Sequence, residues 1–405
     1  MRISLLVVLL VVVGLVLVQP ALATVITGRS STVLEWYDTP DEDTVVPVYE
    51  YLQLKARDIG GQGTNFYGYG RLADDFADED DTVSSRLYSA YFDKSWKDRM
   101  FDLRVGRQFL STTAGASVMD GARLKLNKLW GQPLKLTLFG GGDVKFSEAY
   151  KAGDYVLGGD VHYDFAFGTK AGISYIQKWD EKELGYELLG FDARHEFAKM
   201  LDTYGELQFD LLTESVSYAL VGADYHRAKN WSLRAEYLYS LPVFSSTSIY
   251  SVFAVSEYEE VMLEYNHYLT YDMKAFARLT YEMYVDFDDV QVLEAGVRKM
   301  MMRSDWGGYA IATYRDDEEG QDLYGIKLYG SYRVMPELRA GFGLHIDVLE
   351  RRLDPDVDET TSSRIWTDAI YTLNKRTNVE AKLEYLESDL WDYQLRGRVR
   401  LNWTF

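Results

Sequence analysis

The sequence predicts an all-β chain that closes into an antiparallel up-and-down barrel across a membrane. Segments with alternating apolar and polar residues recur along the chain, which is the period of a strand with two different faces. Tyr, Phe and Trp make up 15% of the residues, although the mean hydropathy is only −0.24. Such aromatic side chains suit the rims of a membrane barrel, where one end of the ring is apolar and the other is wet. The chain also ends on an alternating strand with an aromatic last residue.

The first residues predict export. Arg2 precedes an apolar run from Leu5 to Val18, and Ala21-Leu22-Ala23 supplies the small residues that a signal peptidase recognises. The run is shorter than the roughly 20 residues that a membrane-spanning helix needs. We therefore expect residues 1–23 to be a cleaved signal peptide. Because no linker or internal repeat divides the remainder, we expect residues 24–405 to form one transmembrane β-barrel domain.

The body of the chain predicts strands by alternation. Between Met273 and Met283 one face carries only Met, Ala, Leu and Tyr, whereas the other carries charged residues, Thr and one Phe. No stretch has a helical period, and the prolines after Pro20 fall in or beside the expected connections. The clearest alternating segments are Met100 to Gly106, Ala122 to Leu126, Met273 to Met283, Glu337 to Val348 and Asn378 to Tyr385.

The connections between these segments predict how the strands are oriented. Counting back from Phe405, which should lie at the periplasmic rim, short and often basic turns alternate with acidic loops. The expected inner turns are Lys94 to Arg99, Lys299 to Ser304, Val334 to Pro336 and Leu373 to Arg376. The expected outer loops are Asp38 to Asp43, Asp74 to Asp81, Asp286 to Asp289, Asp316 to Glu319, Asp354 to Glu359 and Glu387 to Leu390.

The same count predicts about 22 strands, within a range of 18–22. Counts from the two ends agree only if Ile249 to Tyr268 form one long, bulged strand. Residues Thr24 to Arg29, before the first expected strand, are too few to form a plug domain. Because barrels of 16–18 strands already enclose an aqueous channel, we expect some obstruction: an inward fold of Leu110 to Ser117, or a bound partner.

Two motifs carry a resemblance to a known class of proteins. At the end of the chain, Val399, Leu401, Trp403 and Phe405 alternate with polar residues, and this strand resembles the C-terminal recognition signal of bacterial outer-membrane barrels. The resemblance implies the outer membrane of a Gram-negative cell.

The second motif is Gly106-Arg107-Gln108 followed by Asp120-Gly121. It resembles a signature of porin-like families, including phosphate-selective and alginate-exporting barrels, in which a strand end leads through a loop to a D-G pair opening the next strand. Between the two lie small and polar residues, of which Ser111, Thr112 and Thr113 are candidates for a constriction loop. Strand alternation would point Arg107 outward at the rim unless a bulge intervenes. A purely structural turn is the competing interpretation.

The polar faces of the strands supply candidate pore-lining residues. Arg396, Arg398 and Arg400 share one face of the last strand, and the preceding hairpin should bring Glu380 near Arg398. These groups must face water, because a charge facing lipid costs roughly 2–4 kcal/mol at mid-membrane. They could form a charged strip that biases ion passage, or a ladder of ion pairs that stiffens the wall. The full candidate set is Arg396, Arg398, Arg400, Glu380, Lys382, Glu384, Arg278, Glu282, His345 and Arg339, with Lys382 expected near Arg396 and Glu384 close by.

Composition excludes several other functions. The formal net charge of −20 and the pI of 4.7 disfavour nucleic-acid binding. The chain has no cysteine, so it can hold no disulfide, thiolate metal site or covalently attached haem of its own. Its five histidines lack metal-binding spacing and no G-x-S-x-G motif occurs, so we expect neither a catalytic nor a metal site. The acidic loops are interpreted as solvated charge, with divalent cations shared with lipopolysaccharide as the alternative.

These observations predict a porin-like channel for passive passage of small polar or ionic solutes, without a cofactor and not an enzyme. The alternative is a barrel that sheathes a periplasmic multihaem cytochrome in a porin–cytochrome electron conduit. The expected surroundings are outer-membrane lipids and lipopolysaccharide, and a homo-oligomer is compatible with the sequence.

Overall fold

The computed structural model describes residues 24–38, 44–61, 63–76, 84–96, 100–145, 153–228, 230–243, 256–286, 288–317, 322–350, 359–389 and 391–405. The expected signal peptide, residues 1–23, lies outside the described residues, as do most residues of the expected acidic loops. Among the residues described, no helix is long and apolar enough to cross a membrane.

The strands follow one another along the chain with short connections. The first twelve are β1 (Val25–Asp38), β2 (Thr44–Val45), β3 (Pro47–Ile59), β4 (Thr64–Asp75), β5 (Arg86–Ser95), β6 (Phe101–Thr112), β7 (Gly115–Leu126), β8 (Leu134–Asp143), β9 (Tyr155–Asp164), β10 (Thr169–Asp180), β11 (Glu183–Phe197) and β12 (Leu201–Asp210). The others are β13 (Ser215–Ala228), β14 (Trp231–Ser240), β15 (Tyr258–Thr270), β16 (Met273–Tyr284), β17 (Val290–Lys299), β18 (Trp306–Asp317), β19 (Leu323–Met335), β20 (Leu338–Glu350), β21 (Glu359–Asn374), β22 (Thr377–Ser388) and β23 (Trp391–Thr404). A 3₁₀ turn, η1 (Leu129–Gly131), precedes β8.

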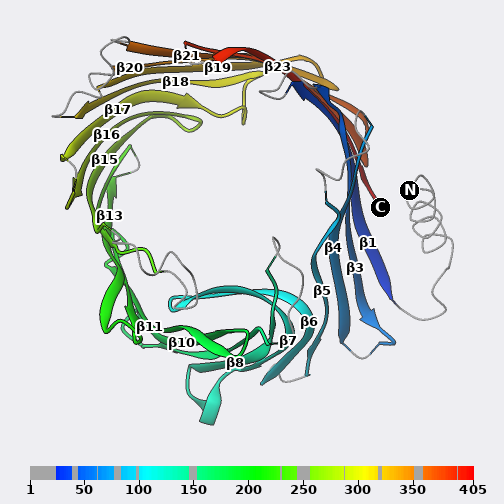
Figure 1. The fold of residues 1–405 in the computed structure, drawn as a ribbon, viewed down its shortest axis with the longest axis vertical. Coiled ribbons are helices and arrows are strands. Elements are labelled where there is room, and N and C mark those ends of the chain that lie inside the picture. Colours follow the sequence, from blue (N-terminus) through cyan, green and yellow to red (C-terminus); the bar gives the residue numbers. More distant parts are fainter. Residues whose placement is uncertain are drawn as a thin grey trace.

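These strands close into a single antiparallel barrel, seen end-on in Figure 1. Neighbouring strands pair in sequence order, and β1 closes the ring by pairing with β23 on one side and β3 on the other. The two-residue β2 pairs with β1 just above β3, so the two together form one strand of the wall. The wall therefore has 22 strands among the described residues, and the predictions of an antiparallel barrel and of its strand number are confirmed. The described residues contain no plug domain.

Two expectations about strand ends were wrong. β1 already begins at Val25, so Thr24 to Arg29 do not precede the first strand. β15 begins only at Tyr258, and Ser256 is not in a strand, so Ile249 to Tyr268 are not one long strand; residues 249–255 lie outside the described residues. Near a barrel rim both faces of a strand meet water, so alternation there no longer marks where the strand ends.

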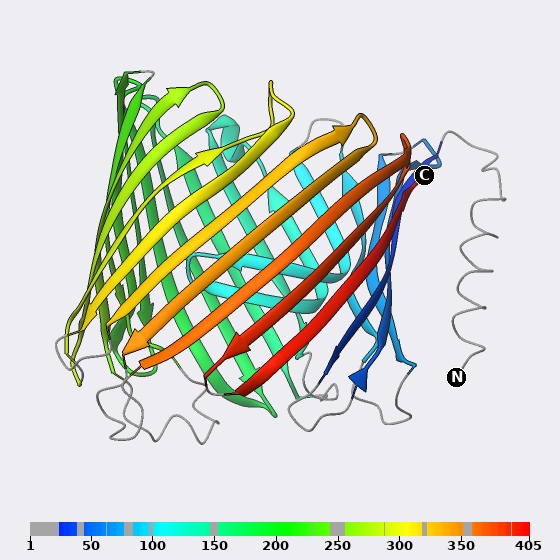
Figure 2. The same ribbon diagram turned by 90° about the horizontal axis from the view of Figure 1, so that it is seen from above.

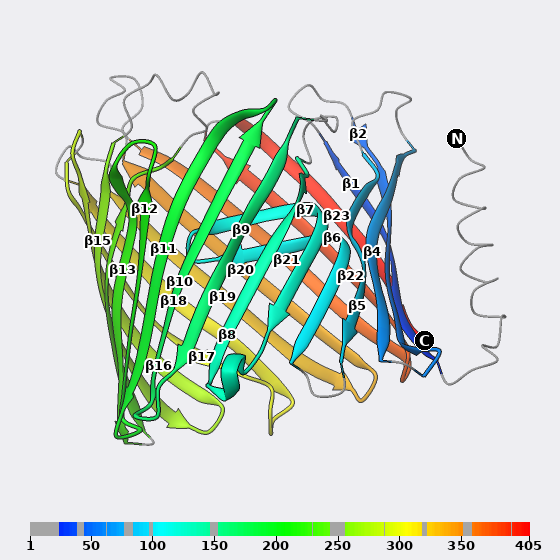
Figure 3. The same ribbon diagram turned by 90° about the horizontal axis from the view of Figure 1, so that it is seen from below.

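The strands run steeply tilted between two rims, as Figures 2 and 3 show. Val25 and the C-terminus lie at one end, which we call the inner rim, because Arg29 pairs with Thr404. The opposite end, the outer rim, is acidic, because several of the strands that run from the inner rim to the outer rim end on an aspartate. These residues are Asp38, Asp75, Asp143, Asp180, Asp210 and Asp317.

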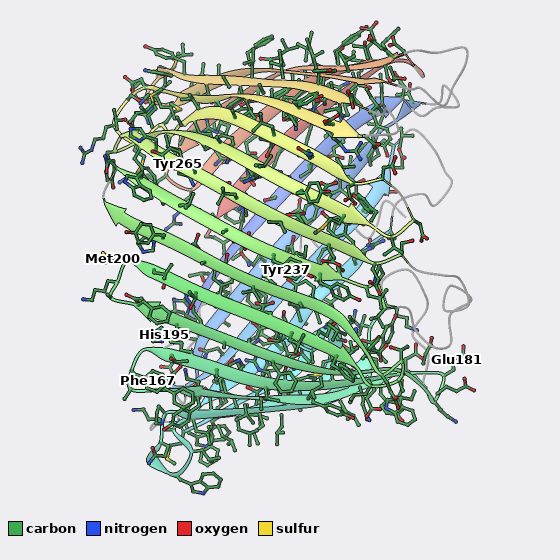
Figure 4. All side chains as sticks on the ribbon, turned by 90° about the vertical axis from the view of Figure 1, so that its left-hand side faces the viewer. Phe167, Glu181, His195, Met200, Tyr237 and Tyr265 are labelled. Carbon is green, nitrogen blue, oxygen red and sulfur yellow. The ribbon has the colours of Figure 1, made fainter. Side chains whose placement is uncertain are left out.

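The outside of the wall is apolar. Large side chains such as Ile173, Val221 and Leu279 are about half exposed, and they alternate with polar residues that face the lumen. Figure 4 views the wall around β11–β15 from outside, with Phe167 and Met200 toward the inner rim and Glu181 at the outer rim. An exposed apolar belt is unfavourable in water and suits a lipid bilayer. The alternation therefore sorts each strand into a lipid face and a lumen face.

Candidate functional site

One hairpin leaves the wall and enters the lumen. β6 pairs with β5 only from Asp102 to Arg107, although β5 continues to Arg86 at the outer rim. β7 pairs with β8 only from Met119 onward. Between these points β6 and β7 remain paired with each other but with neither neighbour, and this part crosses the inside of the barrel as the cyan hairpin of Figures 2 and 3. We call residues 108–118 the lumenal hairpin.

The candidate constriction residues Ser111, Thr112 and Thr113 lie at the tip of this hairpin. The segment is paired strand rather than the loop expected from sequence, since Thr112 pairs with Gly115 and only Thr113 and Ala114 form the turn. Its side chains alternate between a buried and an exposed face. The exposed face includes Phe109, 61% of whose surface is open.

Gly106 makes the bend into the lumen. Its φ of 123° is one that residues with a Cβ rarely adopt. A Cβ at this position would also lie 2.3 Å from the carbonyl oxygen of Ala90 in β5. Gly106 pairs with Gly121 across the hairpin, so two glycines face each other where the two strands turn together.

The remaining motif residues hold this bend. Arg107 is opposite Asp120 and binds both of its carboxylate oxygens, with Nε–Oδ1 at 2.8 Å and Nη2–Oδ2 at 2.7 Å. Arg107 Nη1 also donates to the carbonyl of Leu87, at 3.1 Å, in the part of β5 that β6 no longer covers. Gln108 is fully buried, and its amide faces the carbonyls of Gly106 and Gly121. In this chain the motif residues lie within paired strands, not at the strand ends expected from sequence, and they stabilise a bend.

The buried face of the hairpin packs on an apolar patch of the inner wall. Neighbouring strands contribute side chains that would otherwise face the lumen, and the hairpin covers them. The cluster consists of Leu110, Ala114, Met119, Phe139, Val156, Ile176 and Leu188. Burying one large apolar side chain contributes about 1.5–3 kcal/mol, so this small core favours a seated hairpin over a free one.

Polar contacts fix the hairpin tip against β10, β11 and β12. Thr113 donates from Oγ1 to Oδ1 of Asp192 at 3.0 Å, and the Ala114 N–H donates to Oγ of Ser174 at 2.8 Å. Gln208 donates from Nε2 to the carbonyls of both tip residues, at 3.2 and 3.0 Å. Side chains of the wall thus form hydrogen bonds with the backbone groups of the turn, and these bonds hold the tip in one position, which we call its seat.

Gly190 makes room for that seat. A Cβ at this position in β11 would lie 2.3 Å from the Ala114 nitrogen, so no larger residue fits beneath the turn. A further hydrogen bond joins the Ser117 hydroxyl, at the start of β7, to Asp143 at the end of β8.

Charged residues line another part of the lumen, along β21–β23. Glu384 accepts from Lys382 Nζ at 2.5 Å, from Arg396 Nε at 2.9 Å and from Arg364 Nε at 2.9 Å. Three cations thus share one carboxylate, which is only 8% exposed. Together with Glu380, Arg398 and Arg400, these four residues form what we call the charged strip.

The register of the charged strip differs from the expectation by two residues. Glu380 lies opposite Arg400 rather than Arg398, and Lys382 lies opposite Arg398. The Arg400 Nη1–Glu380 Oε2 distance is 3.9 Å. The pairing of β22 with β23 also shifts register by one residue between Leu386 and Ser388, beside the outer turn.

The candidates on β16 form a separate ion-pair group. Arg278 bridges two strands: Nε lies 2.8 Å from Glu264 Oε2, and Nη1 lies 3.0 Å from Glu294 Oε2. Glu282 lies nearer the outer rim and accepts a hydrogen bond from the Tyr284 hydroxyl at 3.0 Å. The structure does not bring this group into contact with the charged strip.

His345 lies in an aromatic group between the two charged groups. Its Nε2 is 3.2 Å from the Tyr309 hydroxyl, and its ring meets Trp366 edge-on, with 4.7 Å between ring centres. Trp366 also carries the cations of Arg364 and Lys382 over its face. Arg339 is exposed and has the same strand parity as His345, closer to the inner rim.

Sequence reasoning missed several of these residues. Arg364 and Trp366 alternate with Ile365 in β21, and this period of two could have placed both on the face that lines the lumen. Asp192 and Gln208 had no local signal, because their role depends on a hairpin tip about 80 to 95 residues away. Within the described part of the chain no three acidic or histidine side chains are placed to hold a metal ion.

Comparison with known proteins places the fold. No protein-family model and no curated protein sequence matches the chain. The barrel is similar to the P pilus usher (PapC) translocation pore, with a TM-score of 0.53 and 8% identity over 94% of this chain and 99% of that one. It is also similar to an E. coli P pilus tip assembly intermediate, PapC-PapD-PapK-PapG, with a TM-score of 0.57 and 9% identity over 93% of this chain and 60% of that one. Pseudomonas aeruginosa OccK3 (OpdO) matches with a TM-score of 0.47 and 10% identity over 95% and 96% of the two chains. The chain therefore has a closed, 22-stranded antiparallel β-barrel fold that is similar to that of the usher translocation pore.

Proposed function

We propose that the protein is an outer-membrane channel through which small polar or ionic solutes pass passively. One observation carries this proposal: a closed barrel with an apolar exterior has a lumen lined by charged side chains and partly filled by a seated hairpin. Exposed charges are stable only where water or ions reach them, so this lining indicates a lumen that contains water.

The lumenal hairpin supplies the constriction in this proposal. It lies along one side of the wall and is held there by an apolar cluster and by hydrogen bonds to three strands. A segment held in this way narrows the passage permanently, whereas a loop held only at its ends would not. The exposed Ser111 and Phe109 then face passing solutes.

The charged strip supplies the selectivity. It contains five cations, namely Arg364, Lys382, Arg396, Arg398 and Arg400, against the two carboxylates of Glu380 and Glu384. Part of this charge is used in cross-strand pairing, as a stiffening ladder requires. Glu35 lies opposite Arg398 and Asp368 lies opposite Lys382, so the five cations face four carboxylates in all. The local excess is one positive charge, which favours anions here although the chain as a whole carries a charge of −20.

Conductance of the purified barrel in planar bilayers tests the channel. We expect steady single-channel currents, and a sharp rise in conductance when Ser111 to Ala116 are deleted. A control deletion of equal length within residues 351–358, between β20 and β21 in the sequence, should leave the conductance near its original value. No current from correctly folded protein would contradict the channel itself. A current that the hairpin deletion leaves unchanged would contradict its role as the constriction.

The strand number also supports a second candidate function. Barrels with 22 strands are usually plugged, and the described residues contain no plug domain. A sheath around a periplasmic multihaem cytochrome would fill such a lumen. Purification from native membranes tests this: a haem chromophore that co-purifies in fixed ratio must belong to another subunit, because this chain has no cysteine to attach it. Purified protein free of chromophore that still conducts would favour the channel.

A further inference from the structure

A cleft of about 520 Å³ lies between the tip of the lumenal hairpin and the outer half of the wall. The hairpin contributes Thr112 and Thr113, and strands β10 to β14 contribute the opposite side. Polar groups on the wall side include Lys178, Tyr186, Tyr218 and Ser240. No Asp or Glu is among the described lining residues, which is unusual in so acidic a chain.

Lys178 is the only cation among these described lining residues. Its Nζ donates to the carbonyl oxygen of Ala116 in the hairpin at 2.6 Å, and it lies 6.0 Å from the ring centre of Tyr186. No carboxylate of the described residues forms an ion pair with it. The charges of Asp143 and Lys145 both reach it, but they act in opposite senses.

An ammonium group has three N–H donors and no acceptor. The Ala116 carbonyl takes one donor of Lys178, which leaves donors for a further acceptor. A partly enclosed charge without a direct ion pair is unfavourable, and an anion entering the cleft would reduce that cost. The cations of the charged strip differ here, because Arg364, Lys382 and Arg396 already share Glu384.

We propose that this cleft binds a small oxyanion. Lys178 supplies the charge, and the hydroxyl groups of Tyr218 and Ser240 supply hydrogen-bond donors around it. Gln208 lines the same cleft but does not take part, since its amide nitrogen is used by the hairpin tip and its Oε1 by Ser217. The site deepens the proposed channel function by naming a solute class, and it lies on the outer side of the constriction, where incoming solutes arrive first.

A single cysteine in this Cys-free chain can report on the site without any current. Leu241 lines the cleft but is not one of the proposed ligands, so Leu241→Cys places the only thiol of the protein there. The reaction rates of an anionic and a cationic methanethiosulfonate reagent of similar size are compared in detergent. We expect the anionic-to-cationic rate ratio to fall about threefold or more when Lys178→Gln is added, since one charge acts on both reagents with opposite sign.

Sodium sulfate is the competing anion, with sodium chloride at equal ionic strength as the reference. Sulfate should slow the anionic reagent when Lys178 is present and have no such effect with Lys178→Gln. Glutamine keeps an N–H donor toward the Ala116 carbonyl, on a side chain one atom shorter, and removes the charge. Lys170→Gln, on the same strand at the inner rim, is the matched control and should behave as the parent.

The outcomes separate the alternatives. A rate ratio that does not respond to Lys178→Gln, or a ratio that responds without any protection by sulfate, would overturn the oxyanion site and leave Lys178 as a tether only. Should Lys178→Gln fail to fold, Lys178→Arg keeps the charge and should keep the sulfate protection. Because no current is measured, failure of the channel proposal would appear only in the bilayer experiment.

Discussion

Two sectors of the lumen are built from the same kind of strand but in opposite ways. Along β8–β11 the inward side chains include an apolar patch, with Phe139 and Ile176 among its members, and the lumenal hairpin covers this patch. Along β21–β23 the inward side chains are charged, and among the described residues no hairpin lies over them. Apolar groups need a partner surface to leave water, whereas charges can satisfy one another and the solvent. The inward residue type therefore decides whether a stretch of wall is covered or open.

We expect the largest effect from a substitution that fills the space between the wall and the tip of the lumenal hairpin. Gly190→Leu places a side chain where the Ala114 nitrogen lies 2.3 Å from the Cβ position, so the tip must move away. Overpacking commonly costs about 1–3 kcal/mol, and here it opposes backbone that cannot repack. We expect a large rise in single-channel conductance together with noisier current.

Gly205→Leu is the matched control for this change. Gly205 lies in the next strand, and its nearest neighbouring atom would be 3.5 Å from an added Cβ, so a leucine there has room. Its conductance should stay at the wild-type value. Equal conductance in both variants would mean that the seat seen at Gly190 does not set the passage.

The charged sector should respond in selectivity rather than in conductance. Replacing Arg396, Arg398 and Arg400 together by Gln removes three positive charges from the strip. We expect the cation-to-anion permeability ratio to rise roughly several-fold, because selectivity follows the sign of the lining charge. Reversal potentials in a salt gradient measure this. Unchanged potentials from folded protein would leave these arginines with the ion-pair ladder role alone.

Glu384→Gln should lower the cation-to-anion permeability ratio, and by a smaller factor than the arginine substitutions raise it. It removes one negative charge and releases Arg364, Lys382 and Arg396 from their shared partner. We expect the anion permeability to rise roughly twofold. Glu282→Gln, in the group on β16, is the comparison: a similar shift there would show that the effect does not depend on the strip.

The smallest effect is expected at the inner rim, in the turn between β15 and β16. Lys299 Nζ lies 2.6 Å from Asp272 Oδ2, and this hydrogen bond, with one from Thr270, holds the pKa of the Asp272 carboxyl below its ordinary value of 3.8. A lowered folded-state pKa means that the pair stabilises the barrel above pH 3.8 and loses this contribution as the pH falls below it.

Asp272→Asn should therefore lower the temperature at which the folded gel band disappears by a small amount at neutral pH. The difference from the wild type should vanish when the samples are treated well below pH 3.8. A difference that persists unchanged in acid would show that the carboxylate charge is not its cause.

Sequence alone predicted the fold far better than the site. The period of two, the aromatic residues and the C-terminal strand led to a closed barrel of about 22 strands. The strand register at Glu380 and Arg398 could not be predicted, because alternation has a period of two and a shift by two residues leaves every side chain on the same face. The inward direction of Leu110 to Ser117 was a hypothesis, but its contacts with Asp192 and Gln208 are too distant in sequence to be inferred.

The sequences of β8 and β9 nevertheless contain a local signal for the part of the wall that the hairpin covers. Leu138 and Phe139, like Val156 and Leu157, are adjacent apolar residues, so both faces of β8 and β9 are apolar at this height. A strand between lipid and water should be apolar on one face only. Two apolar faces in a membrane barrel therefore indicate that another part of the chain covers the inner one.

The position of the hairpin's anchors has a consequence for how the sequence can change over generations. Asp192, Ser174 and Gln208 belong to the wall strands β11, β10 and β12, not to the connections between strands. Exposed connections tolerate substitution and insertion more readily than the elements they join. Substitutions in the connections can thus accumulate without altering the position of the hairpin, because the residues that hold the hairpin are not the residues of the connections.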